Sequence, residues 1–195
     1  MGRIALSLLT AFAVHSLSGC ASIREIANLR NVRFGIDALS GLEVAGIDVM
    51  GVRTYEDLSA IDVIRIGSAV SQRELPVRFV LDIGAYNPED NGVQARLVRM
   101  DWTLLLEDQE TISGVFEEEL VIPSGESRHF PISVQLDLID FFDRNARDLV
   151  ELALSLAGEG GEAKNIKLRA TPVINTVLGP IRYPEPITIV SGTIG

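Results

Sequence analysis

The stretch "LPVRFVLDIGAYNPEDNG", residues 75–92, decides the fold class because it alternates apolar and polar side chains. Its odd-numbered residues from 77 to 85 are all apolar, whereas Arg78 and Asp82 lie between them. A period of two residues is typical of a β-strand with one buried face. Asn87-Pro88 ends the strand, since proline has no N–H to donate to a neighbouring strand and presets a turn.

Further alternating segments lie on both sides of this stretch, and turn signals recur after about every ten residues. These segments are residues 32–52, 93–107, 111–122, 128–138, 165–174 and 185–192. Short strands at such regular spacing favour an antiparallel sandwich. The sequence therefore predicts a mainly β domain of about seven strands, with one or two helices and no internal domain boundary.

The first of two helical segments lies within residues 54–70. Thr54 or Asp57 would cap a short helix here. One face of that helix would hold Leu58, Ile61 and Ile64.

The second helical segment, residues 138–156, repeats apolar residues every three and four positions. Asp140 and Asp143 would lie in its first turns, where the helix dipole favours negative charge. Gly158 would end it. This segment predicts a helix longer than the first.

The N-terminal segment "MGRIALSLLTAFAVHSLSGC", residues 1–20, has Arg3 as its only charge and an apolar run over residues 4–14. That run is too short to span a bilayer and has the length of a signal-peptide core. Its end resembles a bacterial lipobox, formed by Leu17, Ser18, Gly19 and Cys20. The pattern predicts a lipoprotein signal peptide at 1–19, a lipidated cysteine and tether at 20–30, and a single domain at 31–195.

Cys20 is the only cysteine of the chain, so its chemistry sets the compartment. Cleavage before it and acylation of its sulfur and amino group would attach the protein to a membrane, since several acyl chains anchor stably. A residue other than Asp after the cysteine, here Ala21, favours the outer membrane by analogy with enterobacterial sorting. We therefore expect a bacterial envelope protein that faces the periplasm, with an ordinary buried cysteine as the alternative.

The charge balance excludes some classes of partner. The chain has 17 basic and 27 acidic residues, a net charge of −10, and removal of residues 1–19 would take away Arg3 and leave −11. Nucleic-acid binding needs clustered Lys and Arg, so no nucleic-acid partner is expected. Anionic lipid headgroups would repel such a surface, which leaves the lipid on Cys20 as the membrane attachment. A hydrophobic content of 47% argues against a disordered chain.

The turns between the strands carry a resemblance to a known family. An apolar strand ends in Asn87-Pro88, Gly114 follows a short polar turn, and Ile122-Pro123-Ser124-Gly125 forms the next turn. In this order, over roughly residues 30–136, the pattern resembles the LEA type 2 family, also called the WHy (water stress and hypersensitive response) domain. Glu89 departs from it, because the family usually has another polar residue there, often Asn.

The resemblance implies a folded Ig-like or fibronectin-like β-sandwich with a helix. It also implies a non-catalytic role in tolerance of desiccation, osmotic or other stress. For Asn87 and Pro88 a structural role in the turn is sufficient, because asparagine can cap a turn that proline presets.

Clusters of metal-ligating or catalytic residues are not evident in the sequence. His129 stands alone in a predicted strand, where a solvated or hydrogen-bonded histidine is the favoured interpretation, and His15 belongs to the signal peptide. Glu117 and Glu119 would share a face of one strand and could hold calcium with help from elsewhere, although a solvated acidic edge is the favoured interpretation. Asp137, Asp140 and Asp143 are typical helix-start charges. We expect no metal, no cofactor and no enzymatic activity.

Three functional hypotheses remain open. The first is a lipid-anchored protein that protects its neighbours or the envelope as water is lost. The second is a binding or adaptor module in which the helix at 138–156 covers an apolar groove for a lipid, a peptide or a partner protein. The third is a component of a larger envelope assembly, which an exposed apolar patch would indicate.

Overall fold

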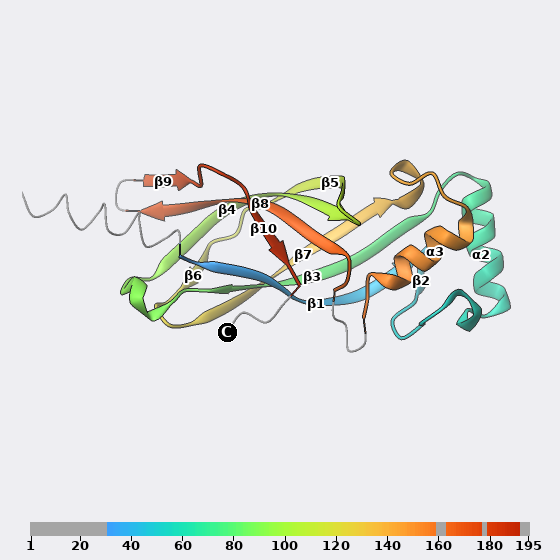
Figure 1. Ribbon diagram of the computed structural model, residues 1–195, viewed down its shortest axis with the longest axis horizontal. Helices are drawn as coiled ribbons and strands as arrows, with labels where there is room; N and C mark the ends of the chain where they lie inside the picture. Colours follow the sequence, from blue (N-terminus) through green and yellow to red (C-terminus); the bar gives the residue numbers. More distant parts are fainter. Residues whose placement is uncertain (1–30, 159–162, 177–178, 192–195) are drawn as a thin grey trace, which may run out of the picture.

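A computed structural model describes residues 31–158, 163–176 and 179–191, and the prediction of a mainly β sandwich is confirmed there. These residues form ten strands, two α-helices and three short 3-10 turns. The strands make two antiparallel sheets whose apolar faces enclose one core (Figure 1). Cys20 and the lipobox lie outside the described residues.

The four-stranded sheet has the order β2-β1-β3-β7. Its strands are β1 (Arg33–Val44), β2 (Ile47–Asp48), β3 (Pro76–Tyr86) and β7 (Ser127–Asp137). The quoted stretch forms the central strand β3, which pairs with β7 along its whole length from Pro76↔Asp137 to Tyr86↔Ser127. All five odd-numbered residues of β3 from 77 to 85 are buried, as their alternation predicts.

The six-stranded sheet has β10, β8, β4 and β5 in this order, with β6 beside β4 and β9 beside β8. Its strands are β4 (Ala95–Leu106), β5 (Gln109–Phe116), β6 (Leu120–Ile122), β8 (Ile166–Thr176), β9 (Gly179–Arg182) and β10 (Ile187–Val190). The strand count exceeds seven partly because the predicted strand at 111–122 is two strands. Three residues, 117–119, lie opposite only two residues of β4, and this excess breaks the ladder as a bulge does.

Contacts between the sheets close the sandwich on both sides. The rings of Phe116 on β5 and Phe130 on β7 have centroids 4.4 Å apart. On the other side, Ile36 of β1 forms a parallel bridge with Ser191, just after β10. The core between these contacts is apolar, and the only buried polar residues in the described part of the chain are Asn87 and Asn91.

The first helix, α2 (Ala60–Ser71), begins later than predicted. Ser59 caps it by accepting a hydrogen bond from the Asp62 N–H at 3.3 Å, whereas Thr54 and Asp57 form a capping box on a 3-10 turn before it. The predicted face is also wrong: Ile61 and Ile64 are 59% and 70% exposed, and Ile66 is the buried residue of the helix. The side of the helix that faces the core instead runs through Val63, Ile66 and Val70, at spacings of three and four residues.

The second helix, α3 (Ala146–Ser155), begins eight residues after the predicted start. Asp137 accepts hydrogen bonds from the backbone N–H groups of Leu75 and Ile139, which holds residues 138–140 in a 3-10 turn. Asn145 is the true N-cap, at 3.0 Å from the Asp148 N–H. Five side chains of α3 are buried: Leu149, Val150, Leu152, Ala153 and Leu154. They pack into the core, and a pocket beside the C-terminal end of the helix is lined by Val52, Leu154 and Lys164 among others.

The sandwich has two different ends. β1 begins at the end where β3 turns into β4, and α2 and α3 cover the opposite end (Figure 1). Among the described residues, no helix is long and apolar enough to cross a membrane.

Candidate functional site

The two turns of the family resemblance, at Asn87-Pro88 and at residues 122–125, meet at the end of the sandwich where β1 begins, whereas Gly114 lies elsewhere on β5. We call this cluster the Asn87 joint: Asn87, Pro88, Asn91 and residues 122–126. The Asn87 side chain is fully buried. Its Nδ2 donates to the carbonyls of Val93 and Ile122, both at 2.9 Å. Asn87 thereby ties the β3–β4 turn to β6.

The backbone of Asn87 completes the joint. Its N–H donates to the Glu126 carbonyl at 3.0 Å, and its carbonyl accepts from the Gly125 N–H at 2.7 Å. Its Oδ1 accepts from Asn91 Nδ2 at 2.5 Å. All of these hydrogen bonds join neutral amide groups, so Asn87 and Asn91 satisfy the polar groups that are buried here.

Glu89 lies against Gly125, at the outer side of the joint. Gly125 has a φ of +78°, and a Cβ atom at this position would lie 2.8 Å from Glu89 Cγ. The Ser124 hydroxyl donates to the Glu89 carbonyl at 3.1 Å. Glu89, the departure from the family pattern, therefore packs directly against the glycine of the second turn.

Gly114 has a packing role on β5. It lies opposite Trp102 of β4, and a Cβ atom there would come within 2.3 Å of the indole ring. Glycine thus leaves room for the indole, which is largely buried. The spacing in the sequence marks this position, but only the register shows which side chain requires it.

The residues just before β1 also contact the joint. Asn31 Nδ2 donates to Asn91 Oδ1 at 3.1 Å, and the next residues lead into β1. Leu17, Ser18, Gly19 and Cys20 lie outside the described residues, so lipidation stays a prediction.

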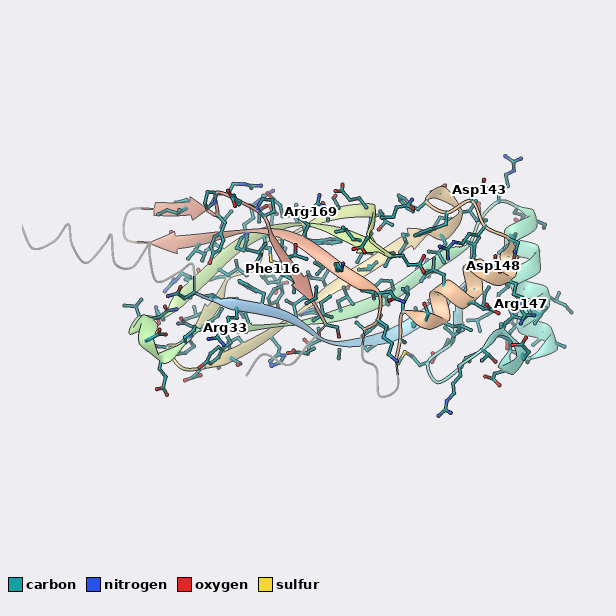
Figure 2. The ribbon with its side chains drawn as sticks, in the orientation of Figure 1. Arg33, Phe116, Asp143, Arg147, Asp148 and Arg169 are labelled. Atoms are coloured by element: carbon teal, nitrogen blue, oxygen red, sulfur yellow. The ribbon has the colours of Figure 1, made fainter. Side chains whose placement is uncertain are left out.

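The outer face of the six-stranded sheet is covered by ion pairs, and we call it the charge-paired face. Arg99 and Arg182 both contact Asp101, and their hydrogen bonds lower the pKa of that carboxyl. Further pairs are Arg96–Glu119, Arg99–Glu117, Arg169–Glu110 and Lys167–Asp108 (Figure 2 labels Arg169). The predicted shared strand face of Glu117 and Glu119 is wrong, since both lie in the break between β5 and β6 and face different arginines.

His129 is a partly exposed, hydrogen-bonded histidine, as expected, and its two carboxylate partners were not evident in the sequence. Its Nδ1 lies 3.2 Å from Asp37 Oδ2 and 3.2 Å from Asp82 Oδ2. Burial raises the pKa of Asp37, His129 opposes this, and the Asp82 carboxylate adds to it. Within the described residues these three form the one group of potential metal ligands, whereas Asp137, Asp140 and Asp143 do not converge. Sequence reasoning missed the group because its members lie on three strands.

Comparisons with known proteins identify no family for this chain. No family model matches the chain, and no curated protein matches it. A crystal structure of a protein from Archaeoglobus fulgidus is similar with a TM-score of 0.32 and 11% identity, over 61% of this chain and 88% of that one. The solution structure of a candidate late embryogenesis abundant (LEA) protein is similar with a TM-score of 0.39 and 11% identity, over 96% of this chain and 84% of that one. Function must therefore be inferred from the chain's own residues.

Proposed function

We propose that this chain is a non-enzymatic, lipid-anchored protein of the bacterial cell envelope that protects against desiccation and osmotic stress. The Asn87 joint carries the proposal. Asn87 and Ile122 are 35 residues apart, yet they share a buried hydrogen bond, and Gly125 closes the same cluster. Two of the turns that resemble the LEA type 2 family therefore form one structural unit, which supports the resemblance and the stress-related role that it implies.

The charge-paired face supplies a physical basis for protection. Isolated surface ion pairs add little to stability, typically about 0–1 kcal/mol each. The ion pairs instead give the protein a strongly hydrated surface of alternating charges. The net charge of −10 opposes self-association. Such a surface could separate neighbouring proteins as water is lost.

The position of the joint fits an anchored protein. A lipid on Cys20 and a tether over 20–30 would bring the membrane to the end of the sandwich where Asn31 contacts Asn91. In this arrangement α2 and α3 point away from the membrane (Figure 1). We place the anchor in the outer membrane, facing the periplasm.

Drying a labile enzyme with residues 24–195 of this protein tests the protective role directly. These residues include the whole described fold and omit the lipid. The control is an equal mass of an inert acidic globular protein. We expect clearly higher recovered activity with this protein, and equal recovery would refute direct protection. A deletion strain that survives drying and osmotic shock as well as its parent would refute the role in the cell.

The anchor has a separate test. Cys20→Ala should leave the precursor uncleaved and unlipidated, because acylation of the sulfur precedes cleavage in lipoproteins of this kind. Mass spectrometry of the membrane fraction would show both changes. An unchanged mass and unchanged fractionation would exclude the lipoprotein assignment without affecting the drying assay.

A binding module is the second candidate, and one observation favours it. Ile61 and Ile64 are largely exposed on α2, at the end of the sandwich opposite the joint. Photo-crosslinking from position 64 in intact cells should then give a defined protein or lipid adduct, whereas position 185, an exposed site after β9, should not. No adduct at position 64 would remove this candidate.

A further inference from the structure

Asp37, Asp82 and His129 come from three neighbouring strands of the four-stranded sheet. Asp37 lies on β1, Asp82 on β3 and His129 on β7. We call them the three-strand site. One ligand atom from each side chain lies within 4.8 Å of the other two. The site is separate from the Asn87 joint and from the charge-paired face, which belongs to the other sheet.

The backbone brings the two carboxylates together through a bulge in β1. Ile36 pairs with Ile83 and Ala38 pairs with Asp82, so Asp37 has no partner on β3. An extra residue of this kind redirects its side chain, and bulges often do so beside functional sites. Here Asp37 turns toward Asp82 on the outer face, where a regular strand would have placed only one of residues 37 and 38.

The histidine reaches the same place because a glycine leaves room for it. Asp82 pairs with Pro131 and His129 pairs with Gly84, so Asp82 and His129 are diagonal neighbours on the outer face. Gly84 has no side chain to lie between them. β3 pairs without interruption on the β7 side, and ligands on such rigid strands are held more firmly than ligands on loops.

The distances suit a metal ion. Nitrogen and carboxylate oxygen ligands lie about 2.0–2.2 Å from zinc, which places neighbouring ligand atoms about 3.3 Å apart in a tetrahedral site. His129 Nδ1 lies 3.2 Å from one oxygen of each carboxylate. A proton on Nδ1 that is shared by both carboxylates would give similar distances. The experiment below distinguishes a bound metal ion from this shared proton.

The charges and exposures also suit a cation. Two carboxylates face one imidazole, so a neutral His129 leaves two negative charges side by side. The His129 and Asp82 side chains are 52% and 45% exposed, which gives an ion access from solvent and leaves its other positions to water. A divalent ion would remove the repulsion that the bulge creates.

We propose that the three-strand site binds one divalent first-row transition ion, with zinc as the probe. The imidazole nitrogen selects this class, because calcium and magnesium prefer sites built from oxygen ligands alone. The ion would join β1, β3 and β7 across the outer face and stabilise the sandwich. The proposal holds whether or not the protein protects against drying.

Zinc titration of the untagged full-length protein in detergent, after treatment with EDTA, tests the site. Isothermal titration calorimetry should give one zinc ion per chain and a weaker response to calcium, and the melting temperature should rise with zinc. Asp37→Asn and His129→Gln should each weaken zinc binding by about tenfold or more, since each removes one of three ligands. Glu43→Gln, which removes a carboxylate from another position of β1, should leave binding unchanged.

A second measurement covers variants that fail to fold. The chain has two histidines, His15 and His129, so the imidazole NMR signals of the unaltered protein are few enough to assign. Zinc should shift the His129 signals in a saturable manner. Absence of saturable zinc binding, or equal binding by Asp37→Asn, would overturn the proposal and favour the shared proton. Tighter binding of calcium than of zinc would overturn the choice of ion.

Discussion

The two ends of the sandwich are closed by opposite means. At the joint end, the buried amide of Asn87 connects the β3–β4 turn to the end of β6 through hydrogen bonds. At the helix end, apolar side chains of α2 and α3, such as Ile66 and Leu152, pack onto the core. The joint thus depends on single residues with specific geometry, whereas the helix end depends on a pattern of apolar residues.

This difference determines how each end should respond to substitution. A buried amide cannot be replaced by an apolar group without leaving its partners unsatisfied. A helix face, in contrast, tolerates change wherever its side chains are exposed. The predictions below compare matched positions in the two kinds of structure, from the largest expected effect to the smallest.

Asn87→Ala should have the largest effect. It leaves the carbonyls of Val93 and Ile122 and the Asn91 amide without their buried partner. Each unsatisfied buried group costs about 1–3 kcal/mol, so we expect a loss of about 3–5 kcal/mol in the free energy of unfolding. Urea denaturation measures this loss, with Asn175→Ala, an exposed asparagine on β8, as the control. Equal losses for both variants would show that the joint does not close its end.

At the helix end, Ile66→Ala should cost about 2–4 kcal/mol, because Ile66 is 1% exposed and its removal leaves a cavity. Ile64→Ala on the same helix should change the free energy of unfolding by less than about 0.5 kcal/mol. Thermal unfolding of the two variants gives the comparison. A larger loss for Ile64→Ala than for Ile66→Ala would mean that α2 packs with the face that its sequence predicts.

The sequence predicted the sheet region better than the helix end. The alternation in β3 and β4 specifies buried faces directly, because side chains of a strand have a period of two. In contrast, α2 and α3 begin where Ser59 and Asn145 bind backbone N–H groups, and several earlier Asp and Thr residues were equally good caps. In α2 apolar residues also occur on both sides of the helix, so the spacing alone does not show that Ile66 rather than Ile64 faces the core.

The candidate sites were predictable to different degrees for a related reason. Asn87 and Gly125 could be named from turn chemistry because each lies in a local turn. The contact between them depends on the pairing of distant strands, as does the approach of His129 to Asp37. The bulge at Asp37 could not be predicted, since only the pairing of β1 with β3 shows that Asp37 is skipped in the register.

Two glycines sharpen the contrast between sheet and helix. Gly114→Ala would bring a methyl group within 2.3 Å of the Trp102 ring, and overpacking of this kind costs about 1–3 kcal/mol. Gly67→Ala, in the middle of α2, meets no atom within 4 Å and should stabilise the protein by about 0.5–1 kcal/mol. Chemical denaturation of both variants should therefore give changes of opposite sign. A stabilising Gly114→Ala would show that the indole does not lie over this position.

Acid should slightly lower the free energy of unfolding through one carboxyl group on the charge-paired face and one beside α2. Hydrogen bonds from Arg182 and Arg99 lower the pKa of Asp101 on the charge-paired face, and the Thr54 backbone N–H is the largest cause that lowers the pKa of Asp57 beside α2. A carboxyl group with a lowered pKa in the folded state stabilises the protein above its unfolded pKa. That contribution is lost as the pH falls through the folded pKa. Both groups should therefore destabilise the protein below about pH 4.

Unfolding measured from pH 7 to pH 2 in the variants Asp101→Asn and Asp57→Asn checks this. Each variant should show a shallower loss of stability in acid than the unaltered protein, and Glu185→Gln, an exposed carboxyl outside both regions, serves as the control. The effects should be small, because solvent screens exposed pairs. They should also shrink further in high salt for Asp101→Asn, whose partners are arginines, and less for Asp57→Asn, whose main partner is a backbone N–H group. Equal salt dependence would show that the two carboxyls are stabilised by the same long-range field rather than by these different contacts.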